Sequence, residues 1–297
     1  MKIVIIGSSG FIGSNLLKFL LKNKYDVIGY DIKESSQVQC LKIESIEDII
    51  TENVFKNTNI IINCSGSADV NFSYLNPLTD FEKNSYDVFK LLDGIIKYNR
   101  QISYINISSG AVYGSLASEK VNEKSQLDPK SIYGFNKLIS ESICEQFNTI
   151  YDIKTTSIRI FSAYGPGLKK QLFWDLFKKA SEKKDIELFG SGNDYRDFVY
   201  IEDVCSSIEV LISQKFRKHE IFNIASGEKT LISEAVSIFF NLLNKKIDYK
   251  FSGNLLKGYP KGQHADISKI IKLGFKPSYS LEKGLSHTIK WMKEQRL

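Results

Sequence analysis

Two patterns of apolar positions alternate along the first half of the chain. Short stretches that are apolar at nearly every position predict strands buried on both faces, and longer stretches with apolar residues every three or four positions predict helices. The expected strands are Lys2–Ile6, Asp26–Tyr30, Ile60–Asn63, Ile102–Ser108 and Lys154–Ile160, and the expected helices are Phe11–Leu21, Pro77–Tyr98 and Ser131–Tyr151. This alternation predicts an α/β fold built on a doubly wound parallel sheet.

The second half of the chain follows a less regular pattern. Helical spacing marks Leu172–Lys183 and Ile232–Leu243, and a further helix is expected to be capped by Asp266 and to end at Gly274. Short strands are expected at Ile186–Phe189, Asp197–Tyr200 and Ile221–Ala225. Since no repeat or long linker interrupts the chain, we expect both halves to share one body with a cleft between them.

Composition narrows the class of protein. The 297 residues are 42% hydrophobic and 25% charged, which is typical of a soluble globular protein. No apolar run is long enough to span a bilayer, and the apolar start M-K-I-V-I-I-G is too short for a signal peptide, so we expect a cytoplasmic protein without a membrane partner. The four cysteines are far apart, which predicts neither a metal site nor disulfides.

The charge pattern limits the class of partner. The net charge is +6, but the lysines are scattered rather than gathered in a stripe or a known module. We therefore expect no nucleic-acid partner. A generally positive field would instead attract an anionic substrate.

The stretch G-S-S-G-F-I-G lies between the first strand and the first helix. Its glycines Gly7, Gly10 and Gly13 are three residues apart, so the bare backbone can approach a pyrophosphate at the start of a helix. Asp31 follows at the end of the second strand, where a carboxylate binds the ribose hydroxyls of NAD and repels the extra phosphate of NADP. Lys33 lies nearby and would soften that discrimination.

Two further motifs carry groups suited to acid–base chemistry. Ser108 and Ser109 end a strand, at the sheet edge where doubly wound folds bind ligands, and a serine hydroxyl there can bond a substrate oxygen. Tyr133 and Lys137 are four residues apart in S-I-Y-G-F-N-K, which places them on one face of a helix. A lysine and a cationic nicotinamide ring would stabilise the phenolate and lower the tyrosine pKa from its usual value near 10.

Taken together, these motifs resemble the extended short-chain dehydrogenase/reductase family, in particular its NAD-dependent sugar-nucleotide epimerases, dehydratases and reductases. The resemblance continues through R-I-F-S-A-Y-G-P-G, G-S-G-N-D-Y-R-D-F-V-Y-I-E-D-V, N-I-A-S-G and L-G-F-K-P. It implies a Rossmann NAD-binding domain over residues 1–165, joined by 202–222. It also implies a smaller α/β domain over 166–201 and 223–297 that binds the nucleotide sugar.

The resemblance also implies a role for individual residues. Tyr133 would be the catalytic base and acid, Lys137 its partner, and Ser109 the residue that binds the reacting hydroxyl. The implied cofactor-binding residues are Gly7, Gly10, Phe11, Ile12, Gly13, Asp31, Asn84, Ser108, Tyr133 and Lys137. The implied substrate-binding residues are Ser109, Gly110, Tyr133, Ser162, Arg196, which would pair with the diphosphate, and Lys261.

Three functions fit this pattern. The first is an NAD-dependent 4-epimerase of a nucleoside-diphosphate (NDP) sugar that works through a transient 4-keto intermediate. The second is an NAD(P)H-dependent reductase of an NDP-4-keto-6-deoxysugar, and the third is a dinucleotide-binding regulator without catalysis. Gly110 and Ala111 stand where the family's dehydratases carry an Asp-Glu pair, which argues against a 4,6-dehydratase.

The family resemblance extends to assembly and pathway. It implies a homodimer in which the helices over Pro77–Tyr98 and Ser131–Tyr151 pair with those of a second copy. It also implies a place in polysaccharide biosynthesis.

Overall fold

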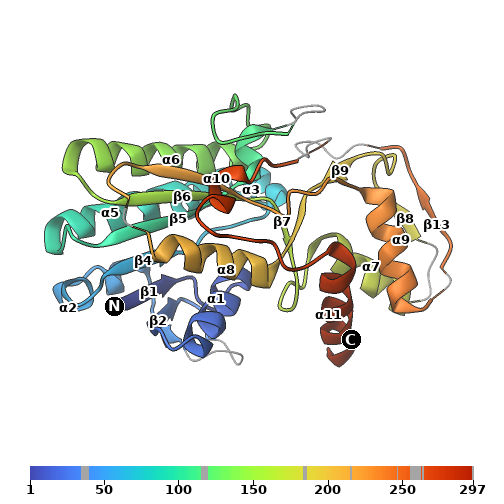
Figure 1. Ribbon diagram of the computed structural model, residues 1–297, viewed down its shortest axis with the longest axis horizontal. Helices are drawn as coiled ribbons and strands as arrows, with labels where there is room; N and C mark the ends of the chain where they lie inside the picture. Colours follow the sequence, from blue (N-terminus) through green and yellow to red (C-terminus); the bar gives the residue numbers. More distant parts are fainter. Residues whose placement is uncertain are drawn as a thin grey trace.

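A seven-stranded parallel sheet forms the centre of the computed structural model, which describes residues 1–34, 40–114, 120–182, 186–214, 216–245, 247–254, 262 and 264–295. The strand order is β11-β6-β5-β4-β1-β2-β3 (Figure 1). The strands are β1 (Lys2–Ile6), β2 (Asp26–Asp31), β3 (Leu41–Lys42), β4 (Ile60–Asn63), β5 (Ser103–Ser109), β6 (Thr155–Ile160) and β11 (Glu220–Ile224). This is the 3-2-1-4-5-6 order of a Rossmann fold with one further strand, so the predicted fold class is confirmed.

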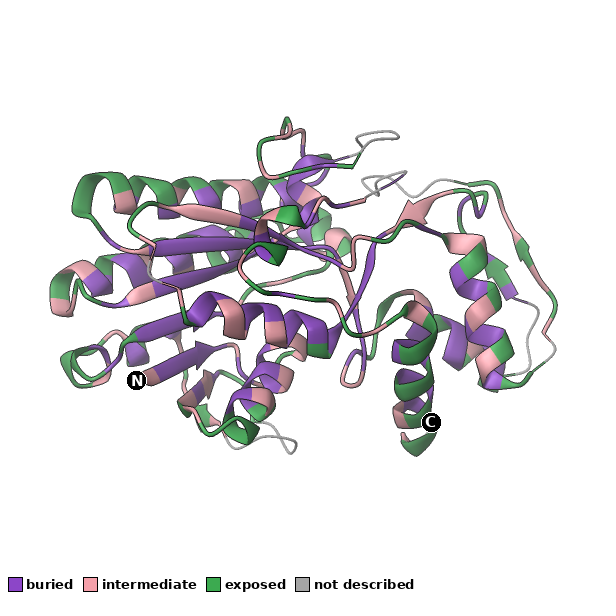
Figure 2. Ribbon diagram, viewed as in Figure 1, coloured by how far each residue is buried: buried purple, intermediate pink, exposed green. Residues whose placement is uncertain are grey.

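Helices cover both faces of this sheet (Figure 1). Helices α5 (Asp87–Tyr98) and α6 (Ile132–Tyr151) pack on one face, and α1 (Phe11–Lys22) and α8 (Ile201–Ile212) pack on the other. Successive side chains of a strand point to opposite faces, so β1 contributes to both cores. Burial on both sides explains why the strands read as unbroken apolar runs (Figure 2).

Smaller elements lie beside the sheet, toward its carboxyl edge (Figure 1). Strand β7 (Ser162–Tyr164) follows almost directly on β6 and pairs with β10 (Phe198–Tyr200). Two more pairs, β9 (Tyr195–Arg196) with β12 (Thr230–Leu231) and β8 (Ile186–Leu188) with β13 (Tyr249–Phe251), accompany the helices. Those helices are α7 (Gln171–Ser181), α9 (Ile232–Leu243) and α11 (Leu281–Glu294), whereas α10 (Ser268–Ile271) contacts β11 of the main sheet.

The helix expected over Pro77–Tyr98 is built from three consecutive pieces. They are α4 (Pro77–Phe81), a π-helical turn η2 (Glu82–Tyr86) and α5. The helix expected after Asp266 is shorter than predicted. It is the single turn α10, which ends before Gly274. The remaining elements are η1 (Ile46–Ile49), α2 (Glu52–Lys56), α3 (Val70–Leu75) and η3 (Gly110–Tyr113). Within the described part of the chain, no helix has the length and apolarity required to cross a membrane.

Candidate active site

The glycine-rich loop forms a cradle of bare backbone between β1 and α1. Gly7 has a φ of +75°, and a Cβ atom on it would lie 2.6 Å from the backbone nitrogen of Ser65. A Cβ atom on Gly13 would lie 2.2 Å from the carbonyl oxygen of Gly7. Helix α1 starts after Gly10 with no side-chain cap and no acidic residue in its first turn. Its exposed amide groups therefore suit an anion such as a pyrophosphate.

Asp31 is joined to this cradle by hydrogen bonds. Its Oδ2 accepts from the backbone N–H of Ser9 at 2.9 Å, and its Oδ1 accepts from that of Lys33 at 2.9 Å. The carboxylate is thus fixed at the end of β2 while each oxygen keeps a second acceptor position. Phe11 and Ile12 form the first turn of α1 and are half-buried against the core.

Ser109, Tyr133 and Lys137 are brought together as predicted from the sequence. Ser109 ends β5, while Ser131 caps α6 by accepting from the N–H of Gly134 at 3.1 Å, which starts the helix just before Tyr133. The Ser109 hydroxyl is hydrogen-bonded to the Tyr133 phenol. The Lys137 ammonium donates to the carbonyl oxygen of Ile107 at 2.8 Å and lies 5.9 Å from the centre of the Tyr133 ring.

Burial dominates the electrostatics of this group. It raises the pKa of Tyr133 to about 12; the hydrogen bond from Ser109 opposes this rise and the charge of Asp80 adds to it. Burial also lowers the pKa of Lys137 to about 8, against the opposing charge of Asp80. The expected lowering of the tyrosine pKa by Lys137 is not seen here: burial is the largest influence on Tyr133 and raises its pKa, so the phenol is protonated at neutral pH.

Asn84 and Ser108, both expected to bind the cofactor, are buried. Asn84 lies in the π-helical turn, donates to the carbonyl oxygen of Ser67 at 3.2 Å, and has an Oδ1 with no hydrogen-bond partner in the part of the chain that the structure describes. That buried acceptor fits a ligand that brings a donor. The hydroxyl of Ser108 instead donates to Glu141, so it is already engaged within the protein.

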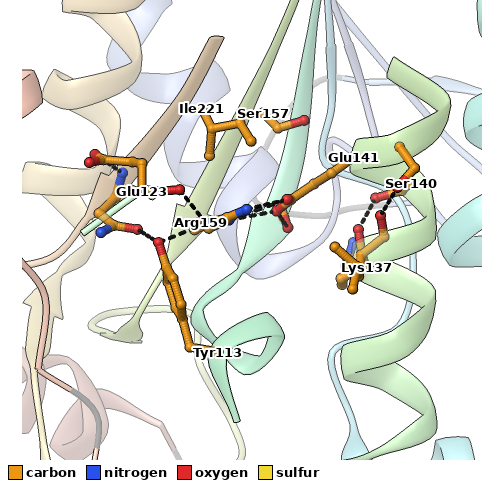
Figure 3. A network of polar contacts seen from close by, with 12 residues as sticks. Tyr113, Glu123, Lys137, Ser140, Glu141, Ser157, Arg159 and Ile221 are labelled. Carbon is orange, nitrogen blue, oxygen red and sulfur yellow. Dashed lines mark hydrogen bonds and ion pairs between the residues drawn. The ribbon is translucent and has the colours of Figure 1, made fainter. Parts of the chain in front are cut away.

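Glu141 belongs to a buried network that the sequence analysis missed (Figure 3). Arg159 donates to Glu141 through Nη2 at 2.7 Å and Nε at 3.0 Å, and it donates to the hydroxyl of Tyr113 at 2.8 Å. Tyr113 in turn donates to Asn223 on β11 at 2.7 Å. The network thus connects α6 to the turn that follows Ser109. The sequence held two signals of this network. They were Arg159 inside the buried strand β6 and Glu141 one helical turn after Lys137.

The expected substrate-binding residues lie on several different elements. Ser162 on β7 is half-buried, and its N–H donates to the carbonyl oxygen of Asp197 at 3.0 Å. Arg196 on β9 is half-buried and donates to the carbonyl oxygen of Tyr195 at 2.8 Å. A Cβ atom on Gly110 would lie 3.3 Å from the Phe161 ring, so this position is crowded. Lys261 lies outside the described residues. Its neighbour Gly262 forms an isolated β-bridge with Tyr195.

The chain is similar in sequence and structure to proteins of one family. Residues 3–225 match the model of the NAD dependent epimerase/dehydratase family. An uncharacterized UDP-glucose epimerase of Bacillus subtilis is 28% identical, over 98% of both chains. The UDP-glucuronic acid 4-epimerase of Bacillus cereus, solved with UDP-glucuronic acid and NAD, has a TM-score of 0.89 at 28% identity, over 99% of both chains. The UDP-glucose 4-epimerase of Thermotoga maritima, solved with UDP-glucose, has a TM-score of 0.89 at 27% identity, also over 99% of both chains.

Proposed function

Since the chain belongs to the NAD-dependent epimerase/dehydratase family, as its sequence motifs predicted, we propose that it interconverts the C4 epimers of an NDP-sugar with NAD as its cofactor. The observation that carries this proposal is the group formed by half-buried Ser109 with the buried Tyr133 and Lys137 at the carboxyl edge of the sheet. Gly110 and Ala111 next to it offer no acid for water elimination, which favours a reaction without dehydration.

The cradle and its neighbours fit NAD. Gly7, Gly10 and Gly13 would hold the pyrophosphate at the start of α1, and the two oxygens of Asp31 would accept from the ribose hydroxyls. Asn84, whose buried Oδ1 has no hydrogen-bond partner among the described residues, would lie on the cofactor side of the site. When bound, NAD supplies the acceptor and donor for the hydride of the sugar C4 and a positive charge near the phenol.

The side chains then have distinct tasks in our proposal. Ser109 would hold the 4-hydroxyl of the sugar, and Tyr133 would take its proton as C4 loses a hydride and becomes a 4-keto group. Lys137 would stabilise the phenolate with its ammonium charge. After the keto sugar turns over in the cleft and C4 regains the hydride on its opposite face, Tyr133 would return the proton to the keto oxygen, which becomes the hydroxyl of the epimer.

UDP-hexoses are the substrates that we propose. The relatives named above include epimerases of UDP-glucose and UDP-glucuronic acid. Arg196 and Lys261 would contribute positive charge to the diphosphate, and Ser162 would hydrogen-bond the substrate. These three assignments are part of the proposal, as is the division of the chain into a cofactor domain and a substrate domain.

One experiment tests the function directly. The protein is purified without added cofactor and denatured, and the released dinucleotide is identified by chromatography. The native enzyme is then incubated with UDP-glucose or UDP-glucuronic acid, and the products are followed by NMR. We expect retained NAD and formation of the 4-epimer without net cofactor consumption. An empty site that consumes NADPH with a 4-keto sugar would overturn the epimerase and support the reductase.

We further propose that the enzyme is a homodimer in the cytoplasm. Apolar side chains stay exposed on the outer surface of α5 and α6, among them Phe89, Phe135 and Ile139. A largely apolar groove of about 520 Å³ runs along α6 between Phe135 and Gln146. The matching helices of a second copy would cover this surface, as the family resemblance implies. The four cysteines, all free, fit a reducing compartment.

A further inference from the structure

Asp80 is a fully buried carboxylate next to the catalytic pair, and the proposed reaction does not use it. It lies on α4, where its Oδ2 accepts from the side-chain amide of Asn136 at 2.7 Å. Its Oδ1 is also buried and has no hydrogen-bond partner among the described residues. A carboxylate removed from water in this way is costly unless a positive charge compensates it.

Lys137 presents the opposite problem on the neighbouring helix. Lys137 is 6% exposed, and the hydrogen bond from its ammonium group to the carbonyl oxygen of Ile107 involves no negative charge. A buried ammonium needs a counter-charge as much as a buried carboxylate does. The structure gives Lys137 no salt bridge within the described residues.

The charges around Lys137 leave one candidate. Besides Tyr133, the titratable groups that influence it are Asp80 on α4, Cys64 after β4 and Glu141 on α6. Glu141 is already neutralised by its bidentate ion pair with Arg159. Desolvation raises the pKa of the Cys64 thiol to about 12, although part of the residue reaches the surface, so this group is neutral. The carboxylate of Asp80 is therefore the uncommitted negative charge.

Hydrogen bonds fix Asp80 against the turn that carries Lys137. Asn136 precedes Lys137 in α6 and makes one hydrogen bond to α4 and one to the π-helical turn η2. Its side chain donates to Asp80, and its carbonyl oxygen accepts from the hydroxyl of Ser85 at 2.9 Å. Asp80 and Ser85 thus hold this turn from outside the catalytic group.

We infer that Asp80 is a positioning residue that supplies the counter-charge of Lys137 and thereby sets the upper pH limit of catalysis. The catalytic part of this inference rests on the proposed epimerase function. The electrostatic part concerns the folded protein alone, so it can be tested separately.

The sign of the pH effect follows from the two charges. Burial lowers the pKa of Lys137 to about 8, and the negative charge of Asp80 opposes that change. The ammonium is present below this pKa and is lost as the pH rises through it. Removal of the charge at Asp80 lowers the pKa further, so activity disappears at a lower pH. The same change lowers the pKa of Tyr133, which Asp80 raises, so the acidic limb moves in the same direction.

The first test is a double-mutant cycle on unfolding. Asp80→Asn, Lys137→Met and the double variant are unfolded in urea at pH 7. We expect Asp80→Asn to change the unfolding equilibrium constant differently in the two backgrounds, by a factor of about ten, the equivalent of one pKa unit. Additive effects within a factor of two would overturn the inference. Asp69→Asn, which removes an exposed carboxylate that caps α3, is the matched control and should be additive with Lys137→Met.

The second test is the pH dependence of kcat. For Asp80→Asn, we expect the alkaline limb to move down by about one pH unit, with a loss of roughly tenfold at pH 9 and less than about threefold at pH 6.5. Asp80→Glu should restore the wild-type profile. An unchanged alkaline limb in a folded, NAD-loaded Asp80→Asn protein would overturn the inference. If the two substitutions are coupled in the unfolding cycle but no epimerisation is found, the proposed function is overturned and the counter-charge role of Asp80 stands. If the enzyme epimerises its substrate but the substitutions are not coupled, the counter-charge role is overturned and the proposed function stands.

Discussion

At the scale of single residues, the protonation state of Tyr133 depends on burial and on the charges around it. Tyr133 is 8% exposed, and burial raises its pKa to about 12, so the phenol is protonated at neutral pH. In the proposed reaction it would become a base only when positive charge gathers next to it. Lys137 would supply part of that charge, and the bound cofactor would supply the rest.

Replacement of Tyr133 by Phe should abolish turnover, because it removes the hydroxyl that would exchange a proton with the sugar in the proposed reaction. We expect kcat to fall by at least about 10²–10⁴-fold, the usual contribution of general acid–base catalysis, with folding and retained NAD nearly unchanged. NMR of the UDP-sugar mixture and chromatography of the released cofactor measure the two quantities. Tyr151→Phe, on the same helix but half-exposed, is the control. Near-normal activity of Tyr133→Phe would mean that the tyrosine is structural.

Replacement of Asp31 by Ala should weaken NAD binding and reduce the preference for NAD over NADP. The charged hydrogen bonds to the ribose would be lost, and we expect Kd for NAD to rise about ten- to a hundredfold. Fluorescence titration of the cofactor-free protein measures the dissociation constants for NAD and for NADP. Asp26→Ala, at the exposed start of the same strand, should leave them unchanged. Unaltered NAD affinity in Asp31→Ala would contradict the assignment of this carboxylate to the ribose.

At the scale of elements, α6 places every group that the proposed chemistry takes from it on one helical face. Tyr133, Lys137 and Glu141 follow at intervals of four residues. The first two face the site, and the third fixes the helix to β6 through Arg159 (Figure 3). Since Glu141 also accepts from Ser108, the position of α6 and the end of β5 are fixed together.

Replacement of Glu141 by Gln should therefore destabilise the protein strongly. It would leave Arg159, which is 1% exposed, as a buried charge without its partner. Loss of one member of a buried pair typically costs about 3–5 kcal/mol, which urea unfolding monitored by circular dichroism can measure. The control is Glu145→Gln. Glu145 lies one turn after Glu141 in α6 and is exposed. Equal stability of the two variants would show that the network contributes little to the fold.

The sequence predicted the elements of the sheet best, for a physical reason. Burial on both faces makes β1 and β4 nearly continuous apolar runs, so both were predicted to the residue. Helix α8 was missed because it follows β10 directly, with Tyr200 as an N-cap that lacks a capping side chain. The π-helical turn was missed because its residues E-K-N-S-Y are almost all polar, and the seven-residue interval from Phe81 to Val88 across it fits an α-helix.

The sequence predicted the central group of the site but not its surroundings. The four-residue interval between Tyr133 and Lys137 survives in any helix, so the pair could be recognised locally. Asp80 and Arg159 come from other elements, and only the fold brings them to α6. Their contacts depend on how helices pack, which no local pattern records.

At the scale of the whole molecule, the parallel sheet collects the site at one edge. The glycine loop follows β1, Ser65 follows β4, and Ser109 ends β5, so these groups meet where three neighbouring strands stop. The smaller elements begin at the same edge, since β7 starts just after β6 ends. A sugar nucleotide bound there would contact both parts of the chain.

Replacement of Ile139 by Asp should convert the proposed dimer into a monomer. Ile139 is 40% exposed and lines the apolar groove on α6, so a charge there would be buried against the second copy. Light scattering should give twice the chain mass of 33.8 kDa for the wild type and a single chain mass for the variant. Ile271→Asp, at a site 45% exposed on α10, should remain dimeric. A monomeric wild type would refute the assembly.

The late position of β11 has a consequence for the synthesis of the protein. This strand pairs with β6, although the chain between them builds β7 to β10, α7 and α8. A ribosome must therefore translate as far as residue 224 before β6 gains its outer neighbour. During that interval the nascent chain presents an edge of β6 with unpaired backbone groups, the kind of surface at which strands associate wrongly. The passage from residue 160 to residue 224 is where a chaperone would be needed most.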